Sequence, residues 1–296
     1  MKQHYFIGGA SKCGTTAIYH YLRQHPEVVL PLMKELHYFS RNELSKRLSG
    51  PGDRYVLDEV PSSFSEYMGH YQKCLGNQIS VDISPSYFFY PEAAERIKKQ
   101  FPKAKIVFIL RSPADKIFSQ YHHLYSKARE TLSFEEALGE EEMRKKLGYS
   151  DMWLYRESGF YADKVQNWIT ALGKNRVKVM FFEKFREAPR GFMQELCEFL
   201  EIRSDFEFST ESEVNISGIP RSNILARMLL RPNPLTKFLR RVLPNQFGKD
   251  FKLWLRNLNN GGRVTFDPSS KRELASCYVK DIEALEAILE KKTGWL

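Results

Sequence analysis

The residues near the amino terminus have the composition of a loop that binds an anion. Gly8–Thr16 reads G-G-A-S-K-C-G-T-T and follows a short apolar run. Apolar residues at helical spacing come next, so the expected order is a strand, a tight loop and the start of a helix. A loop of this kind directs free backbone N–H groups and the helix dipole towards one point. It therefore favours a bound phosphate or sulfate group.

The position of the lysine separates this loop from a Walker A motif. In a Walker A motif the lysine follows the last glycine and precedes a serine or threonine. Here Lys12 stands two residues before Gly14. We therefore expect a site for a phosphate-like group whose ligand is not ATP.

A second anion pocket is predicted where a buried strand ends in arginine. The five apolar residues of Ile106–Leu110 are typical of a strand buried on both faces, and Arg111 follows them. Pro113 suits the first turn of a new helix, in which Ser119 would lie two turns along. P-loop NTPases place a magnesium-binding aspartate at a comparable strand end. Arginine neutralises charge directly, so two pockets without a metal carboxylate indicate a nucleotide with two separate phosphate groups.

Together these motifs resemble those of the sulfotransferases that use PAPS (3′-phosphoadenosine 5′-phosphosulfate). The first loop is similar to their 5′-phosphosulfate loop, which would comprise Ser11, Lys12, Cys13, Gly14, Thr15 and Thr16. Arg111 to Ser119 is similar to their 3′-phosphate motif, R-x-P-x-x-x-x-x-S. Gly261, Gly262 and Arg263 resemble the late loop that closes on the 3′-phosphate. Val177–Phe185 resembles a late core strand and its turn, and the helical end resembles the bacterial branch, so the likeness covers nearly the whole chain.

The resemblance implies both a fold and a reaction. The fold would be a P-loop-like, three-layer α/β domain with a mostly parallel central sheet. The reaction would move a sulfuryl group from PAPS to a hydroxyl or amine, leaving PAP (3′-phosphoadenosine 5′-phosphate), without a metal. By analogy with phosphoryl transfer, in-line positioning and charge stabilisation would dominate. Lys12 is the expected cation beside the bridging oxygen.

Two residues compete for the role of general base. Lys34-Glu35-Leu36-His37-Tyr38-Phe39 resembles the K-E-x-H-[FY]-F stretch of heparan sulfate and related sulfotransferases. That resemblance implies Glu35 as the base. His37 is the alternative, because many cytosolic small-molecule sulfotransferases use histidine. Two structural roles also stay open, a salt bridge from Glu35 to Lys34 or Lys12 and a partly buried His37 ring.

One motif departs from the heparan sulfate enzymes. Several of them carry E-K-[ST]-P-x-Y before the arginine motif, and this chain has D-I-S-P-S-Y at residues 82–87. The acid is retained as Asp82, whereas Ile83 replaces a lysine that assists catalysis in that subgroup. Asp82 would orient Lys12 or the acceptor, or else cap the end of the strand. The aromatic residues 87–90 would line the acceptor cleft or belong to the core.

The remaining pattern is that of one α/β domain over residues 1–296. A strand at Ile79–Ser84, a helix start at Ser133 and helices at 91–101, 161–172, 187–200 and 269–292 alternate along the chain. This order predicts helices on both faces of the sheet and ligand loops at the carboxyl ends of its strands. Gly50–Gly76 is the most loop-like region of the sequence and would border the acceptor site.

Charge and cysteine content narrow the classes of partner. The chain has 45 Lys and Arg against 36 Asp and Glu, a formal charge of +9, and part of the excess lies in a basic, proline-broken helical insertion at about 220–258. Its basic residues within 221–256 would pack on the core, touch a membrane surface or meet an anionic polymer. No zinc-finger or RNP1 pattern indicates specific nucleic-acid recognition. The four cysteines form no C-x-x-C pair that would indicate a zinc ribbon.

The sequence leaves the acceptor open. A carbohydrate or glycoconjugate is expected, and a small-molecule, lipid or polyketide alcohol is the alternative. A non-catalytic anion-binding protein is a further alternative, whereas Lys12 and Arg111 argue against a metal-dependent kinase or NTPase. The sequence shows no apolar run of membrane-spanning length and no signal-peptide pattern, which predicts a bacterial cytoplasmic protein. It does not indicate an oligomeric state.

Overall fold

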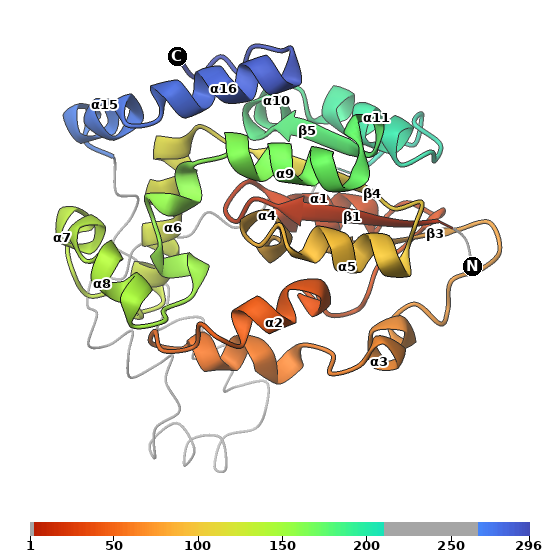
Figure 1. Cartoon of the computed structure of the whole chain (residues 1–296). Helices are drawn as coiled ribbons and strands as arrows, with labels where there is room; N and C mark the ends of the chain where they lie inside the picture. The colour runs from red at the N-terminus through yellow and green to blue at the C-terminus, as the bar shows by residue number, and fades with distance from the viewer. Residues whose placement is uncertain (1–2, 210–265) are drawn as a thin grey trace, which may run out of the picture.

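The computed structural model of the chain describes residues 3–209 and 266–296 (Figure 1). The predicted basic insertion and the predicted loop Gly261–Arg263 lie outside these residues. Within residues 3–209 and 266–296, none of the helices combines the length and the apolar character needed to cross a membrane.

A five-stranded parallel sheet forms the centre of the fold, in the order β2-β3-β1-β4-β5. The strands are β1 His4–Gly9, β2 Val28–Val29, β3 Ile79–Ile83, β4 Lys105–Leu110 and β5 Val177–Phe181. On β1, Phe6 pairs with Asp82 of β3 on one side and with Ile106 of β4 on the other. The prediction of a mostly parallel α/β sheet is confirmed.

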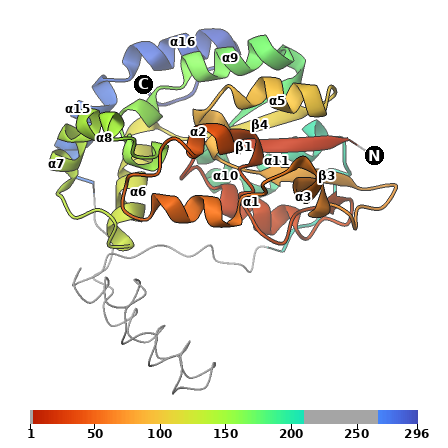
Figure 2. The same cartoon turned by 60° about the horizontal axis from the view of Figure 1, so that its bottom comes forward.

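Helices cover both faces of the sheet, as expected (Figure 2). Those along the chain are α1 Thr15–Leu22, α2 Arg41–Leu44, α3 Phe64–Gly69, α4 Ser86–Phe89, α5 Ala93–Gln100, α6 Pro113–Ser126, α7 Phe134–Gly139, α8 Glu141–Lys146, α9 Ala162–Leu172, α10 Phe182–Glu187, α11 Pro189–Phe199, α15 Pro268–Ser276 and α16 Val279–Leu289. Helices α5 and α9 lie on one face and α16 packs outside α9, whereas α1, α10 and α11 lie on the other. Helix α6 leaves the carboxyl edge of the sheet and leads to α7 and α8 (Figure 1).

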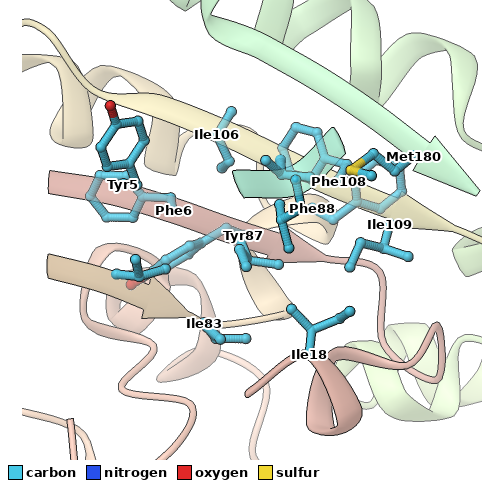
Figure 3. Packing of buried hydrophobic residues seen from close by; sticks show 14 of the residues in the cluster. Tyr5, Phe6, Ile18, Ile83, Tyr87, Phe88, Ile106, Phe108, Ile109 and Met180 are labelled. Atoms are coloured by element: carbon cyan, nitrogen blue, oxygen red, sulfur yellow. The ribbon is translucent and has the colours of Figure 1, made fainter. Parts of the chain in front are cut away.

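The core lies between the sheet and these helices (Figure 3). Ile106–Leu110 is fully buried, in agreement with the prediction of a strand covered on both faces. The ring of Phe108 lies 5.0 Å from that of Phe88 on α4 and 5.2 Å from that of Trp168 on α9. Because both aromatic contacts come from helices on one face, they fix these helices against the central strands.

Most of the predicted elements are present, with two corrections. Ser133 caps α7 in a full capping box with Glu136, as its sequence indicates. The prediction of a single final helix at 269–292 is wrong, because the segment forms two helices, α15 and α16. Tyr278 separates them, with its ring buried and its hydroxyl donating to the Arg156 carbonyl at 3.0 Å. Gly50–Gly76 is not simply a loop, because it contains a 3₁₀ segment at Asp53–Glu59 and helix α3.

Candidate active site

The described site residues predicted from the sequence follow neighbouring strands at the carboxyl edge of the sheet, and Glu35 and His37 lie on the segment after β2. The loop with Lys12 follows β1, the segment after Asp82 follows β3, and Arg111 follows β4. Since β1 lies between β3 and β4, the chain reverses its direction of winding here. Such a switch point at the carboxyl edge is where ligands bind in open α/β sheets.

The first loop has the backbone that an anion site needs. The N–H of Ala10 donates to the Ile109 carbonyl at 2.7 Å, which ties the loop to β4. Gly14 precedes α1 with φ of 86°, and a Cβ there would lie 2.6 Å from the Phe182 ring. Only glycine fits both requirements. The first N–H groups of α1 lack partners within the helix and so face the loop.

Lys12 is half-buried in this loop and meets a residue of α6. Its Nζ lies 3.2 Å from Nδ1 of His123. Burial and the nearby charge of Lys127 lower the pKa of Lys12 to about 8. Burial and the charge of Lys12 lower the pKa of His123 to about 3, so the ring is neutral and Nδ1 accepts from the ammonium group. An ammonium group with little solvent and a neutral partner is available to a bound anion.

Lys34 joins the anion loop to Glu35. Its Nζ donates to Oγ1 of Thr16 at 2.8 Å and to Oε1 of Glu35 at 2.5 Å. Burial alone would raise the pKa of Glu35, but the contact with His37 and the charge of Lys34 outweigh it and hold this pKa well below its usual range. The side chain of Glu35 is nevertheless 40% exposed. Glu35 is therefore an ionised carboxylate that an acceptor can reach, and it forms the salt bridge with Lys34 that its sequence allowed.

The His37 ring is held on both sides by protein groups. Nδ1 lies 2.6 Å from Oγ of Ser86, and Nε2 lies 3.6 Å from Oε2 of Glu35. Its side chain is only 13% exposed. The partly buried ring allowed by the sequence is thus what the structure shows, with one nitrogen directed at the carboxylate of Glu35.

Asp82 lies beneath the site and is fully buried. Oδ1 accepts from Ser84 at 2.6 Å, and Oδ2 accepts from the hydroxyls of Tyr87 at 2.7 Å and Tyr67 at 3.0 Å. These hydrogen bonds, within the described part of the chain, do not include Lys12. The contacts are closer to the predicted role at the end of the strand than to a direct contact with Lys12.

Arg111 and Ser119 lie at the same edge of the sheet, on the β4 side. The guanidinium of Arg111 lies 5.2 Å from the centre of the Phe182 ring, in a cation–π contact. Its carbonyl accepts from the Tyr161 hydroxyl at 3.0 Å. The N–H of Ser112 donates to Glu183 at 2.9 Å where α6 begins. Both Arg111 and Ser119 are half-buried.

Two residues at this site were not singled out by the sequence analysis. Lys34 was visible only as part of a motif, and its contacts with Thr16 and Glu35 depend on the loop after β2. The spacing of His123 could have indicated its place, because it follows Ser119 by four residues and so lies on the same face of α6. Neighbouring His122 would have been an equal candidate without knowledge of the phase of the helix.

Most of the aromatic run after Asp82 and the cysteine of the anion loop are buried. Tyr87, Phe88 and Tyr90 are buried, so these members of the aromatic run belong to the core. Burial raises the pKa of Cys13 to about 12, which keeps its thiol protonated and unreactive. In residues 3–209 and 266–296 no group of three or more His, Cys, Asp or Glu side chains is arranged to hold a metal.

Comparison with known proteins identifies the family to which the chain belongs. A model described as "Sulfotransferase family" matches residues 5–206. A heparan sulfate glucosamine 3-O-sulfotransferase 6 of Mus musculus is 29% identical over 198 residues, which cover 67% of this chain and 52% of the relative. A bifunctional heparan sulfate N-deacetylase/N-sulfotransferase 4 of Mus musculus is 25% identical over 213 residues, which cover 69% of this chain and 23% of the relative.

A solved structure agrees over the whole chain. The crystal structure of a sulfotransferase from Alicyclobacillus acidocaldarius superimposes with a TM-score of 0.79 and 30% identity, covering 100% of this chain and 99% of that one. By contrast, the chain spans about half or less of the length of the two curated relatives.

Proposed function

Since the chain belongs to the sulfotransferase family, we propose that it moves a sulfuryl group from PAPS to a hydroxyl or amine of a carbohydrate or glycoconjugate. The observation that carries the proposal is the double contact of Lys34. It touches Thr16 of the anion loop and the carboxylate of Glu35, so the nucleotide site and the candidate base adjoin. An anion-binding protein without catalysis would not need that carboxylate beside its anion.

The donor set around the loop fits the phosphosulfate end of PAPS. The hydroxyls of Thr15 and Thr16, the start of α1 and two lysines, Lys12 and Lys34, supply hydrogen bonds and positive charge without a metal. Ser11, Cys13 and Gly14 complete the loop through their backbone. PAPS supplies an activated sulfuryl group. The charge of Lys12 would stabilise the phosphate oxygen that leaves.

Glu35 is the proposed base. It would accept the proton of the acceptor O–H or N–H as the acceptor atom bonds to sulfur and the bond from sulfur to the bridging oxygen breaks. Its lowered pKa keeps it ionised at neutral pH. It also makes Glu35 a weak base. His37 and Lys34 both lower this pKa, and a turn of Lys34 towards the phosphosulfate would raise it again.

His37 is less suited to that role. Both of its ring nitrogens already face protein atoms, Ser86 on one side and Glu35 on the other. We therefore propose that His37 orients Glu35 and receives no proton directly from the acceptor.

The 3′-phosphate would lie near Arg111 and Ser119. By resemblance, the proposal extends to Gly261, Gly262 and Arg263. One contact supports it: Phe266, three residues after Arg263, stacks on Phe118 at 4.2 Å, and Phe118 precedes Ser119. Three residues span at most about 10 Å, so the chain is long enough to bring that arginine to the pocket.

The acceptor class rests on the relatives. The names of the two curated relatives describe heparan sulfate enzymes, one acting at a 3-O position and the other on nitrogen. This supports a glycan acceptor and leaves the sulfated atom to experiment. A panel of desulfated glycans, sterols and simple alcohols with PAPS, analysed by mass spectrometry, tests it: sulfation of a glycan alone supports the proposal, and sulfation of only the small alcohols overturns the acceptor class.

A further inference from the structure

The turn that carries Glu35 and His37 has an unusual backbone. Glu35 has φ of 69° and His37 has φ of 52°, both in the left-handed region. For residues other than glycine such conformations cost about 1–3 kcal/mol each, and they persist only where surrounding contacts impose them. The contacts that impose this turn therefore also determine where the carboxylate of Glu35 points.

A buried chain of hydrogen bonds ends on this turn. The backbone N–H of His37 donates to Oγ of Ser84 at 3.0 Å, and the hydroxyl of Ser84 donates to Oδ1 of Asp82 at 2.6 Å. Ser84 and Asp82 are both fully buried. The hydroxyl of Ser84 is thus the link between the end of β3 and the turn.

Asp82 is in turn held from the opposite side. Its second oxygen accepts from Tyr87 and Tyr67, and the Tyr67 hydroxyl lies 2.6 Å from Nε2 of His4 on β1. The carboxylate therefore has protein donors on both oxygens and is fixed to the central strands. A carboxylate held in this way has little freedom to move with the turn.

A second set of contacts orients the imidazole itself. Oγ of Ser86 lies 2.6 Å from Nδ1 of His37 and 2.6 Å from Oγ of Ser40, whose hydroxyl donates to the His37 carbonyl at 3.1 Å. The ring can meet Glu35 only when the backbone of His37 is in place. The link through Ser84 provides that placement.

We infer that Asp82 and Ser84 are positioning residues that hold the Glu35–His37 turn in its left-handed form and so aim Glu35 at the sulfuryl-transfer site. This role differs from an orientation of Lys12 or of the acceptor by Asp82. The inference rests on the proposed function for its catalytic meaning. The position of the turn itself can be tested without turnover.

The charged or titratable groups around Glu35 in the described part of the chain include four side chains. Lys34 and His37 belong to its own turn, Lys12 comes from the anion loop, and His123 comes from α6. If the link to the turn is lost, His37 moves away and one of the two influences that lower the pKa of Glu35 disappears. The pKa of Glu35 should then rise.

The experiment compares Ser84→Ala, Ser84→Thr and Ser158→Ala by ¹³C NMR of the glutamate carboxyl groups during a pH titration. Glu35→Gln assigns the signal. Ser158 is a matched control, because its buried hydroxyl donates to the Tyr155 carbonyl at 2.7 Å and does not contact Asp82. Ser84→Cys is the second variant if alanine prevents folding, because sulfur fills the space and accepts hydrogen bonds only weakly.

We expect Ser84→Ala, or Ser84→Cys, to move the titration of Glu35 to higher pH, and Ser84→Thr and Ser158→Ala to leave it unchanged. Affinity for PAP, measured by calorimetry, should stay the same in all four variants. With an acceptor that the wild-type protein sulfates, Ser84→Ala should lower kcat by up to about 100-fold with little change in KM, as expected for a misplaced catalytic group.

An unchanged titration in a folded Ser84→Ala protein overturns the inference. So does an equal upward shift in Ser84→Thr, because the hydroxyl would then not be what holds the turn. A failure of the proposed function is recognised separately: Glu35→Gln would keep full turnover while the NMR result for Ser84 stands.

Discussion

Nζ of Lys12 lies 3.2 Å from Nδ1 of His123, although 111 residues separate them in the sequence. The contact joins the anion loop after β1 to the last turn of α6. Helix α6 begins beside Arg111, so this one helix connects the proposed 3′-phosphate pocket with Lys12, the proposed cation beside the transferred group. The 3′-phosphate and the phosphosulfate of PAPS would thus be bound by residues that α6 holds at a fixed distance from each other.

Binding of PAP should depend on pH through Lys12. Its pKa in the free protein is about 8, and a bound phosphate would raise it, so binding takes up a proton above pH 8. Affinity should be constant below about pH 8 and fall as pH rises further. Calorimetry in buffers of different ionisation enthalpy would measure the proton uptake. In Lys12→Arg the affinity should be flat over this range, and an identical decline there would contradict the assignment.

Removal of the partner of Lys12 should slow the reaction. His123→Ala leaves the ammonium without its acceptor, and hydrogen bonds to charged groups contribute about 1.5–3 kcal/mol. The expected loss in kcat is therefore about 10- to 100-fold. His123→Gln, whose amide oxygen can accept from Lys12, should recover part of it. Steady-state kinetics at saturating PAPS would distinguish the two, and equal rates for His123→Ala and wild type would show that the contact has no role.

Gly14→Ala should damage the anion loop. The new Cβ would meet the Phe182 ring at 2.6 Å and would sit on a backbone with φ of 86°. We expect a loss of about 1–3 kcal/mol in the free energy of unfolding and a large loss of PAP affinity. Gly191→Ala is the control, since nothing lies within 4 Å of a Cβ there and α11 should become slightly more stable. Chemical denaturation and calorimetry would compare them, and normal PAP binding by Gly14→Ala would refute the geometry of the loop.

Arg111→Ala and Ser119→Ala should weaken binding through the 3′-phosphate. Each variant should lose about 1.5–3 kcal/mol of affinity for PAP if its group makes a charged hydrogen bond. Adenosine 5′-phosphate, which lacks the 3′-phosphate, should bind both variants and wild type alike. Equal losses for the two ligands would place the 3′-phosphate elsewhere.

The sequence predicted those features that depend on neighbouring residues. The strand, loop and helix around Lys12 follow from local apolar spacing and glycine placement, and Ser133 indicates its cap through Glu136. The break between α15 and α16 could not be read from the pattern, because helical spacing continues across it. The contact of the Tyr278 hydroxyl with the Arg156 carbonyl at this break depends on tertiary structure.

The sequence names candidate site residues but does not predict the contacts between them. The motif around Glu35 identified the candidate base, yet nothing in it indicates two left-handed residues or their dependence on Ser84. The salt bridge of Glu35 had two potential partners in the sequence. In the structure Glu35 pairs with Lys34, because the segment after β2 brings that lysine against Thr16. Lys12 instead contacts His123.

The most direct test of the account is the rate of sulfuryl transfer by Glu35→Gln. Glutamine keeps the shape of the side chain and removes the basic carboxylate. On an acceptor that wild type sulfates with PAPS, mass spectrometry should show a rate lower by about 10²- to 10⁴-fold, with PAP affinity unchanged. His37→Ala should retain more activity than Glu35→Gln. Turnover that survives in Glu35→Gln but collapses in His37→Ala, with both proteins folded and binding PAP, would contradict the account and make histidine the base.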